Sequence, residues 1–172
     1  NDNYYLLDPA DRSRYADFTG TGNTMNANGA IVRRLIRDSL RYWVHEMHVD
    51  GFRFDLASVF SRDESGHPIP EPPILYDIET DPVLAGTRLI AEAWDAGGLY
   101  QVGNFAGDRW VEWNGLFRDD VRSFLRGDGG RAYAFVQRFI GSPDLYGHKD
   151  PELESSVNFI TCHDGFTLND LV

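Results

Sequence analysis

The sequence predicts an α/β fold with a parallel sheet, and two observations support this prediction. First, short apolar stretches alternate with segments whose apolar residues recur at helical spacing. Second, carboxylate side chains follow several of the apolar stretches directly. Strands that alternate with helices are typical of βα units. In such units, functional groups gather at the carboxyl ends of the strands.

The longest helix is expected over residues 30–49, where apolar residues recur at helical spacing and Arg33, Arg34, Arg37 and Arg41 fall mostly on the opposite side. Asn28 is its expected N-cap, and Asp50-Gly51 is expected to end it. Shorter helices are expected near residues 81–84 and over 116–125 and 131–140. Strands are expected at 52–56, 88–93, 110–113 and 157–162. Loops are expected at 1–28, 60–73 and 141–153, the last two on the surface.

Size and charge limit the possible functions of the chain. Its 172 residues are enough for one domain with a sizeable core, and no repeat or linker divides them. The formal net charge of −11 argues against a nucleic acid partner, because cationic side chains are needed to neutralise phosphates. No apolar run approaches the roughly 20 residues of a membrane span. The single Cys162 excludes an internal disulfide, and we expect it to be a buried thiol.

The first stretch with chemical character is Gly51-Phe52-Arg53-Phe54-Asp55. Residues two apart on a strand share a face, so Arg53 and Asp55 lie on one side, and a parallel sheet covered on both faces would bury both charges. One interpretation is a structural salt bridge. The other is a carboxylate that its Arg neighbour holds ionised and oriented, as a nucleophile requires.

Two further apolar stretches end in polar groups. Glu92 follows the stretch Leu89-Ile90-Ala91, and Trp94 beside it would suit the apolar face of a sugar ring. His163 and Asp164 follow the last predicted strand. Glu92 could also cap a turn, and Asp164-Gly165 could simply form one. Together, however, carboxylates at the ends of several parallel strands match the paired carboxyl groups of glycoside hydrolysis.

Three segments, GFRFDLAS, IAEAWD and FITCHDGFTLND, resemble signature segments of the α-amylase superfamily in the variant of isoamylases and bacterial glycogen debranching enzymes. The likeness extends over nearly the whole chain, including YYLLDPADRSRYADFTGTGNTMN and EWNGLFRDDVRSFLRG. The resemblance implies that Asp55 is the nucleophile, Glu92 the general acid/base and Asp164 a stabiliser of the transition state. It also implies that Arg53 orients Asp55 and that His163 hydrogen-bonds the sugar.

The resemblance further implies a partial (β/α)8 TIM barrel, with roughly strands four to seven. An earlier family signature, a strand ending in Asp and Asn-His, is absent. We therefore expect an internal fragment of the catalytic domain, residues 1–172, without the first strands, the last strand and the flanking β domains. Its parent would be a retaining hydrolase of α-1,6 branch linkages in glycogen, amylopectin or limit dextrins. We expect it in a bacterial cytoplasm, or in a plastid if the chain is from a plant.

Three alternatives remain open. A transglycosylase could use the same residues, since a sugar can replace water in the second step. A catalytically silent isoamylase-like subunit could keep only glucan affinity, although the presence of Asp55, Glu92 and Asp164 together argues against it. A metal-dependent barrel hydrolase is disfavoured because no His pair or acidic cluster shows metal-ligand spacing. Neither a metal nor another cofactor is expected, and the sequence does not predict an oligomeric state.

Overall fold

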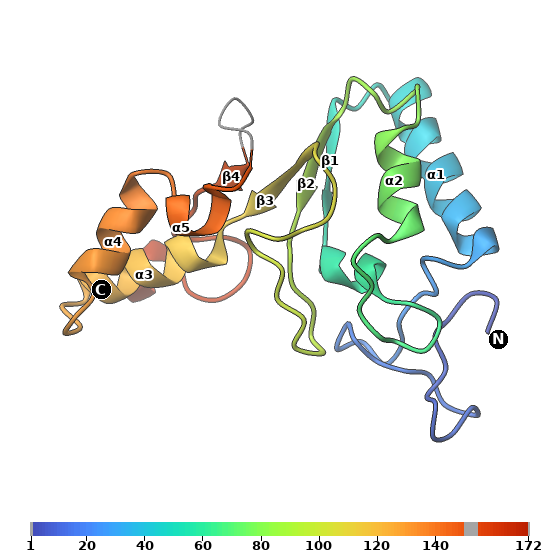
Figure 1. Cartoon of the computed structure of the whole chain (residues 1–172), viewed down its shortest axis with the longest axis horizontal. Coiled ribbons are helices and arrows are strands. Elements are labelled where there is room, and N and C mark those ends of the chain that lie inside the picture. The colour runs from blue at the N-terminus through green and yellow to red at the C-terminus, as the bar shows by residue number, and fades with distance from the viewer. Residues whose placement is uncertain (1, 150–154, 172) are drawn as a thin grey trace. The chain divides into compact units, whose positions relative to one another are not determined.

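The computed structural model describes residues 2–149 and 155–171 (Figure 1). The strands are β1 (Gly51–Phe54), β2 (Arg88–Ala91), β3 (Trp110–Trp113) and β4 (Ser156–Val157), and they form one open sheet in the order β1-β2-β3-β4. The helices are α1 (Ala30–His45), α2 (Pro73–Glu79), α3 (Gly115–Leu125), α4 (Ala132–Phe139) and α5 (Pro143–Tyr146). Two 3-10 helices, η1 (Ala57–Ser61) and η2 (Leu168–Leu171), complete the described elements. The predicted α/β fold is confirmed.

The chain divides into two compact units. The N-terminal unit comprises Asn1–Gln101 and Phe105–Trp110, and the C-terminal unit comprises Val102–Asn104 and Val111–Val172. Within the first unit, residues 2–29 form a long loop with isolated antiparallel bridges, as the composition predicts. Each unit has its own buried apolar residues.

Strands β1 and β2 form the centre of the N-terminal unit. They pair in parallel from Gly51 opposite Arg88 to Phe54 opposite Ala91. A side chain at Gly51 would place its Cβ 2.5 Å from the Arg88 carbonyl oxygen, so this close approach requires glycine. The ring of Phe54 packs edge-on against Trp110, with ring centres 4.9 Å apart. Strand β1 therefore ends against a packed aromatic core.

Helices α1 and α2 lie side by side (Figure 1) and are joined by charged side chains. Arg33 contacts Asp77 at 3.0 Å, and Arg41 contacts Asp81 at 2.7 Å. The side chain of Asp81 is fully buried. Arg33 and Arg37, predicted on the side opposite the apolar residues of α1, therefore face α2, and Arg41 faces the segment that follows α2. Arg34 is instead exposed and pairs with Asp38 of the same helix.

The start of α1 and the segment before α2 differ from the prediction. Gly29, not Asn28, occupies the N-cap position, and no side chain caps the helix. The Asn28 amide instead donates to the carbonyls of Phe60 (2.7 Å) and Arg62 (2.8 Å) and accepts from the N–H of Ile74 (3.2 Å). The predicted surface loop at residues 60–73 is thus tied down, and several of its residues are buried.

Two helix boundaries were also wrong. Helix α1 ends at His45, and His48, whose φ of 55° is left-handed, interrupts the helical conformation before β1. The short helix expected near residues 81–84 forms earlier, as α2, where Pro73 provides a favourable first residue. The Asp81 carboxylate accepts from the N–H of Val83, which makes a turn of the predicted helical segment.

The C-terminal unit is organised by Asn114, which is fully buried. Its side-chain oxygen caps α3 by accepting from the N–H of Phe117 (2.8 Å), and its amide nitrogen lies 3.1 Å from the hydroxyls of Ser142 and Ser156. Helices α3 and α4 pack through stacked rings, with Phe124 and Phe135 centres 4.0 Å apart. These two helices match their predicted ranges to within a residue.

The last strand is much shorter than predicted. Only Ser156–Val157 is extended and paired among the described residues, and Val157 lies opposite Trp113, the final residue of β3. Strand β3 ends at Trp113 and α3 begins at Gly115, so residues 158–162 have no further residues of β3 with which to pair. Cys162 is accordingly half-buried in a loop, and the prediction of a buried core thiol was wrong.

The contacts of Asn28 generate a stability prediction for the full-length protein that contains this chain. Replacing Asn28→Ala removes partners from two carbonyls and one N–H in a partly buried region. We expect the protein to lose about 1–3 kcal/mol of stability, measured as a lower midpoint of thermal or urea unfolding. Asn169→Ala, at an exposed position, is the control and should unfold like the wild type. Equal midpoints for both variants would contradict the assigned role of Asn28.

Candidate active site

The end of β1 carries the first two predicted site residues. Arg53 lies in the strand, and Asp55 follows directly after the last paired residue, Phe54. Nη1 of Arg53 donates to Oδ1 of Asp55 at 2.8 Å. The Arg53 side chain is 25% exposed and that of Asp55 is 71% exposed. The expected burial of both charges is therefore wrong for Asp55, which lies beyond the paired part of the sheet.

The end of β2 brings Glu92 to the same arginine. Nη2 of Arg53 lies 3.1 Å from Oε1 of Glu92, whose side chain is only 4% exposed. The other carboxylate oxygen, Oε2, accepts a hydrogen bond of 2.8 Å from the backbone N–H of Leu56. One guanidinium thus contacts two carboxylates from neighbouring strands, one exposed and one buried.

Leu56 is held in an unusual backbone conformation. Its φ of 43° and ψ of 48° are left-handed, which costs a residue other than glycine on the order of 1–3 kcal/mol. The turn ends β1, begins η1 and directs the Leu56 N–H at Glu92. Backbone bonds from Glu92 N–H to Phe54 O (3.1 Å) and from Ala57 N–H to Glu92 O (2.8 Å) hold it in place. The sequence predicted a strand at Leu56 and gave no sign of this turn.

The environment of Glu92 favours its protonated form. Burial raises the pKa of Glu92 above its ordinary value, and the N–H of Leu56 and the charge of Arg53 oppose that rise. The negative charge of Asp55 and a hydrogen bond to it raise the pKa further. A carboxyl group that keeps its proton can act as a general acid beside an exposed carboxylate that is paired with a cation.

Trp94 lies in the loop that follows Glu92. Its ring stacks on Tyr100, with ring centres 6.0 Å apart and an angle of 11° between the planes. The two residues also form an isolated antiparallel bridge, and the N–H of Gln101 donates to the Ala93 carbonyl at 2.7 Å. Trp94 is half-buried and Tyr100 exposed. The sequence analysis identified Trp94 but assigned no role to Tyr100, six residues further along the chain.

His163 and Asp164 belong to the C-terminal unit, in the loop after β4. Their side chains are exposed, and His163 Nε2 lies 3.5 Å from Asp164 Oδ2. The ring of His163 also lies beside Trp113, with centres 6.1 Å apart, and Trp113 packs on Phe159. Within this unit, aromatic packing thus supports a loop that presents a histidine and a carboxylate.

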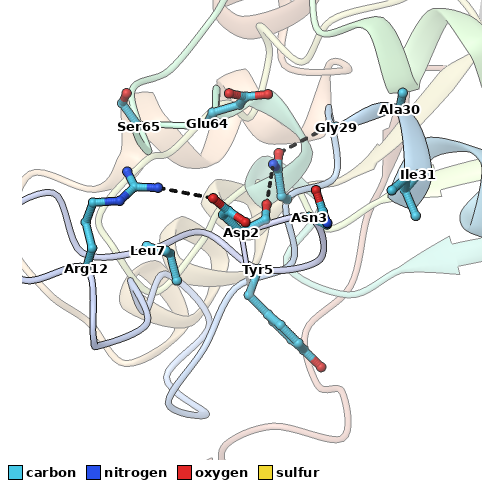
Figure 2. Close-up of a pocket in the computed structure, with 11 residues that line it drawn as sticks. Asp2, Asn3, Tyr5, Leu7, Arg12, Gly29, Ala30, Ile31, Glu64 and Ser65 are labelled. Carbon is cyan, nitrogen blue, oxygen red and sulfur yellow. Dashed lines mark hydrogen bonds and ion pairs between the residues drawn. The ribbon is translucent and has the colours of Figure 1, made fainter.

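Residues 2–149 and 155–171 offer little support for other kinds of site. In this part of the chain, no group of three or more His, Cys, Asp or Glu residues could hold a metal ion. No helix here is long and apolar enough to cross a membrane. A hollow of about 380 Å³ lies near the N-terminus, where Figure 2 shows Arg12 paired with Asp2. Neither Arg53, Asp55 nor Glu92 lines it.

Known proteins resemble this chain over almost its full length. Isoamylase 3, chloroplastic, from Oryza sativa subsp. japonica is 51% identical over 170 residues, which cover 98% of this chain and 22% of the relative. A "Glycogen operon protein GlgX homolog" from Mycobacterium bovis is 52% identical over 174 residues, which cover 100% of this chain and 24% of the relative. The chain therefore spans about a quarter of the length of these relatives. No protein-family model matches it.

Solved structures agree with the sequence relatives. A pullulanase from Anoxybacillus sp. LM18-11, complexed with maltotriose, matches with a TM-score of 0.74 and 28% identity over 98% of this chain and 24% of its own. A type I pullulanase from Bacillus subtilis, complexed with maltose, matches with a TM-score of 0.75 and 26% identity over 98% of this chain and 25% of its own. The open sheet thus has the fold of one part of these enzymes.

The raised pKa of Glu92 leads to a prediction about stability in the full-length protein. The folded state holds this proton more tightly than the unfolded state, so ionising Glu92 weakens folding as pH rises from its ordinary pKa through the raised one. Glu92→Gln cannot ionise. We expect its melting temperature, relative to that of the wild type, to increase as the pH rises above the ordinary pKa of a glutamate, about 4.3.

Glu71→Gln removes one carboxylate at an exposed position and is the matched control for loss of charge. Its melting temperature should follow that of the wild type across the same pH range. A constant difference between Glu92→Gln and the wild type, or one that grows in favour of the wild type with rising pH, would contradict the assigned state of Glu92.

Proposed function

We propose that this chain, which belongs to the isoamylase and glycogen debranching branch of the α-amylase superfamily, is part of the catalytic (β/α)8 barrel of a longer glycosidase. This enzyme would cleave the α-1,6 branch linkages of glycogen, amylopectin or their limit dextrins with retention of configuration. The observation that carries the proposal is the Arg53 guanidinium, which contacts Asp55 and Glu92 at the ends of neighbouring strands.

Asp55 and Glu92 have different environments, which suit the two roles of a retaining mechanism. In the first step, Asp55 attacks the anomeric carbon and forms a bond to it while the glycosidic C–O bond breaks. Glu92 gives its proton to the departing oxygen. In the second step, the Glu92 carboxylate takes a proton from water, whose oxygen attacks the same carbon and releases Asp55.

Arg53 would act on both carboxyl groups during this cycle. Its 2.8 Å contact places a cation beside the Asp55 carboxylate that performs the attack. Its 3.1 Å contact with Glu92 orients the acid and stabilises the carboxylate that forms after proton transfer. The N–H of Leu56 assists at the other oxygen of Glu92. Burial of Glu92 opposes these charged contacts and preserves the proton before the reaction.

We assign sugar binding to Trp94, His163 and Asp164. The stacked pair of Trp94 and Tyr100 offers an aromatic surface next to the acid, and aromatic faces suit the C–H side of a glucose ring. His163 and Asp164 offer an exposed donor and acceptors for sugar hydroxyls. Ligands in the solved pullulanases, maltotriose and maltose, support an α-glucan as the substrate class.

The remaining parts of the proposal concern the parent protein. From the resemblance of its motifs, we assign the chain to barrel strands four to seven. Since it spans about a quarter of its relatives, we expect the other strands and the β domains elsewhere in the parent. We place the enzyme in a bacterial cytoplasm, or in a plastid for a plant source, as relatives named chloroplastic suggest. The mechanism uses this chain's own acids and needs no cofactor.

The linkage is tested with amylopectin and the full-length enzyme. Cleavage of α-1,6 branches releases linear chains, so the iodine colour should deepen while reducing ends increase. Asp55→Asn should leave both readings unchanged, since the nucleophile is lost. Rapid bleaching of the colour would mean attack on α-1,4 bonds and would refute the linkage. Branch cleavage with a constant number of reducing ends would instead identify a transglycosylase.

A further inference from the structure

A buried ion pair lies behind the two loops that follow β1 and β2. Nε of Arg62 contacts Oδ2 of Asp95 at 2.7 Å, and the two side chains are only 6% and 0% exposed. Neither residue takes part in the proposed bond breaking. We propose that Arg62 is a positioning residue that, through Asp95, fixes the loop carrying Glu92 and Trp94. This inference rests on the proposed function.

Asp95 organises the loop from within. Its Oδ1 accepts from the N–H groups of Gly97 (2.9 Å) and Leu99 (3.0 Å), and its own N–H donates to the Leu99 carbonyl at 2.9 Å. These bonds close the turn between Trp94 and Tyr100, whose rings stack on each other. Asp95 comes three residues after Glu92, so its position influences the course of the backbone directly after the acid.

Arg62 connects this turn with two other segments. Its Nη1 donates to the Gly66 carbonyl at 2.6 Å, and its guanidinium lies 3.9 Å from the centre of the Phe18 ring. The Phe18 carbonyl in turn accepts from the N–H of Ala96 at 3.0 Å. Asn28 holds the carbonyl of Arg62 itself. The N-terminal loop, the loop after β1 and the loop after β2 therefore meet at one guanidinium.

A buried ion pair is an expensive way to stabilise a fold, because both ions lose their hydration. Here both carboxylate oxygens of Asp95 have polar partners: Arg62 at Oδ2, and the N–H groups of Gly97 and Leu99 at Oδ1. Removing Arg62 would leave the carboxylate buried without its cation. The loop would then rearrange to bring Asp95 to water. That movement shifts Glu92 relative to the scissile oxygen, and small displacements of an acid reduce rates strongly. Loss of Arg62 should therefore slow the reaction mainly at the step in which Glu92 donates its proton.

Two substrates separate positioning from general stability. A branched glucan has a poor leaving group and needs the proton of Glu92, whereas an α-maltosyl fluoride releases fluoride without it. In the full-length enzyme, kcat and KM are measured for both substrates below the unfolding temperature of each variant. The variants are Arg62→Met, the conservative Arg62→Lys and a matched control, Arg41→Met. Arg41 also forms a 2.7 Å ion pair, with the buried Asp81.

We expect Arg62→Met to lower kcat/KM for the branched glucan by about tenfold or more. The kcat/KM for α-maltosyl fluoride should decrease much less. Arg62→Lys should recover part of the loss, because an ammonium can still pair with Asp95. Arg41→Met should retain the activity of the wild type on both substrates. If Arg62→Met fails to fold, Asp95→Asn is used instead. It keeps the shape of Asp95 and removes the charge that pairs with Arg62, and it should show the same selective loss.

If the wild type is active, two results for Arg62→Met would overturn the positioning role and leave the proposed function intact. One is an equal loss of kcat/KM on both substrates, and the other is no loss on either. A loss in Arg41→Met as large as that in Arg62→Met would overturn it as well, since a general destabilisation would then explain both. A full-length wild type that cleaves neither substrate would reject the proposed function and this inference with it.

Discussion

The candidate site depends on one interaction, the sharing of the Arg53 guanidinium between two carboxyl groups. Without that cation, Asp55 and Glu92 would repel each other at the ends of neighbouring strands. With it, the exposed Asp55 has a cation beside it, while burial of Glu92 still holds its pKa above the ordinary value. A nucleophile and a proton donor require two neighbouring carboxyl groups whose environments differ, so that one is ionised and the other holds a proton. The parallel pairing of β1 and β2 creates this geometry, since it brings both acids to one edge.

Around this interaction, the loops are fixed by groups that take no part in bond breaking. Leu56 adopts a strained turn so that its N–H reaches Glu92, and Asn28 secures the segment that continues from it. Arg62 and Asp95 then hold the following loop from behind. Each of these groups forms hydrogen bonds or an ion pair within the N-terminal unit in place of contacts with water. Such preorganisation is the usual means by which enzymes keep reacting groups in place.

Much of the fold could be predicted from the sequence because its patterns are local. The apolar stretches of β1, β2 and β3 and the periodicity of α3 and α4 are visible in neighbouring residues. The length of β4 was wrong because it depends on where β3 ends, which is a property of the partner strand. The Arg62–Asp95 pair escaped prediction for a similar reason, since 33 positions separate its members. Arg53, Asp55 and Glu92 could be selected as candidates because the strand pattern and the family resemblance pointed to the same residues.

The central claim is that Asp55 forms a covalent bond with the sugar while Glu92 supplies and recovers the proton. It is tested most directly with full-length Glu92→Gln and an α-maltosyl fluoride. The fluoride leaves without a proton, but the variant cannot activate water, so the glycosyl-enzyme should accumulate. Mass spectrometry of the digested protein should find the maltosyl group on the peptide that contains Asp55, and Asp55→Asn should carry none. A maltosyl group on another residue, or steady turnover of the fluoride by Asp55→Asn, would contradict the account.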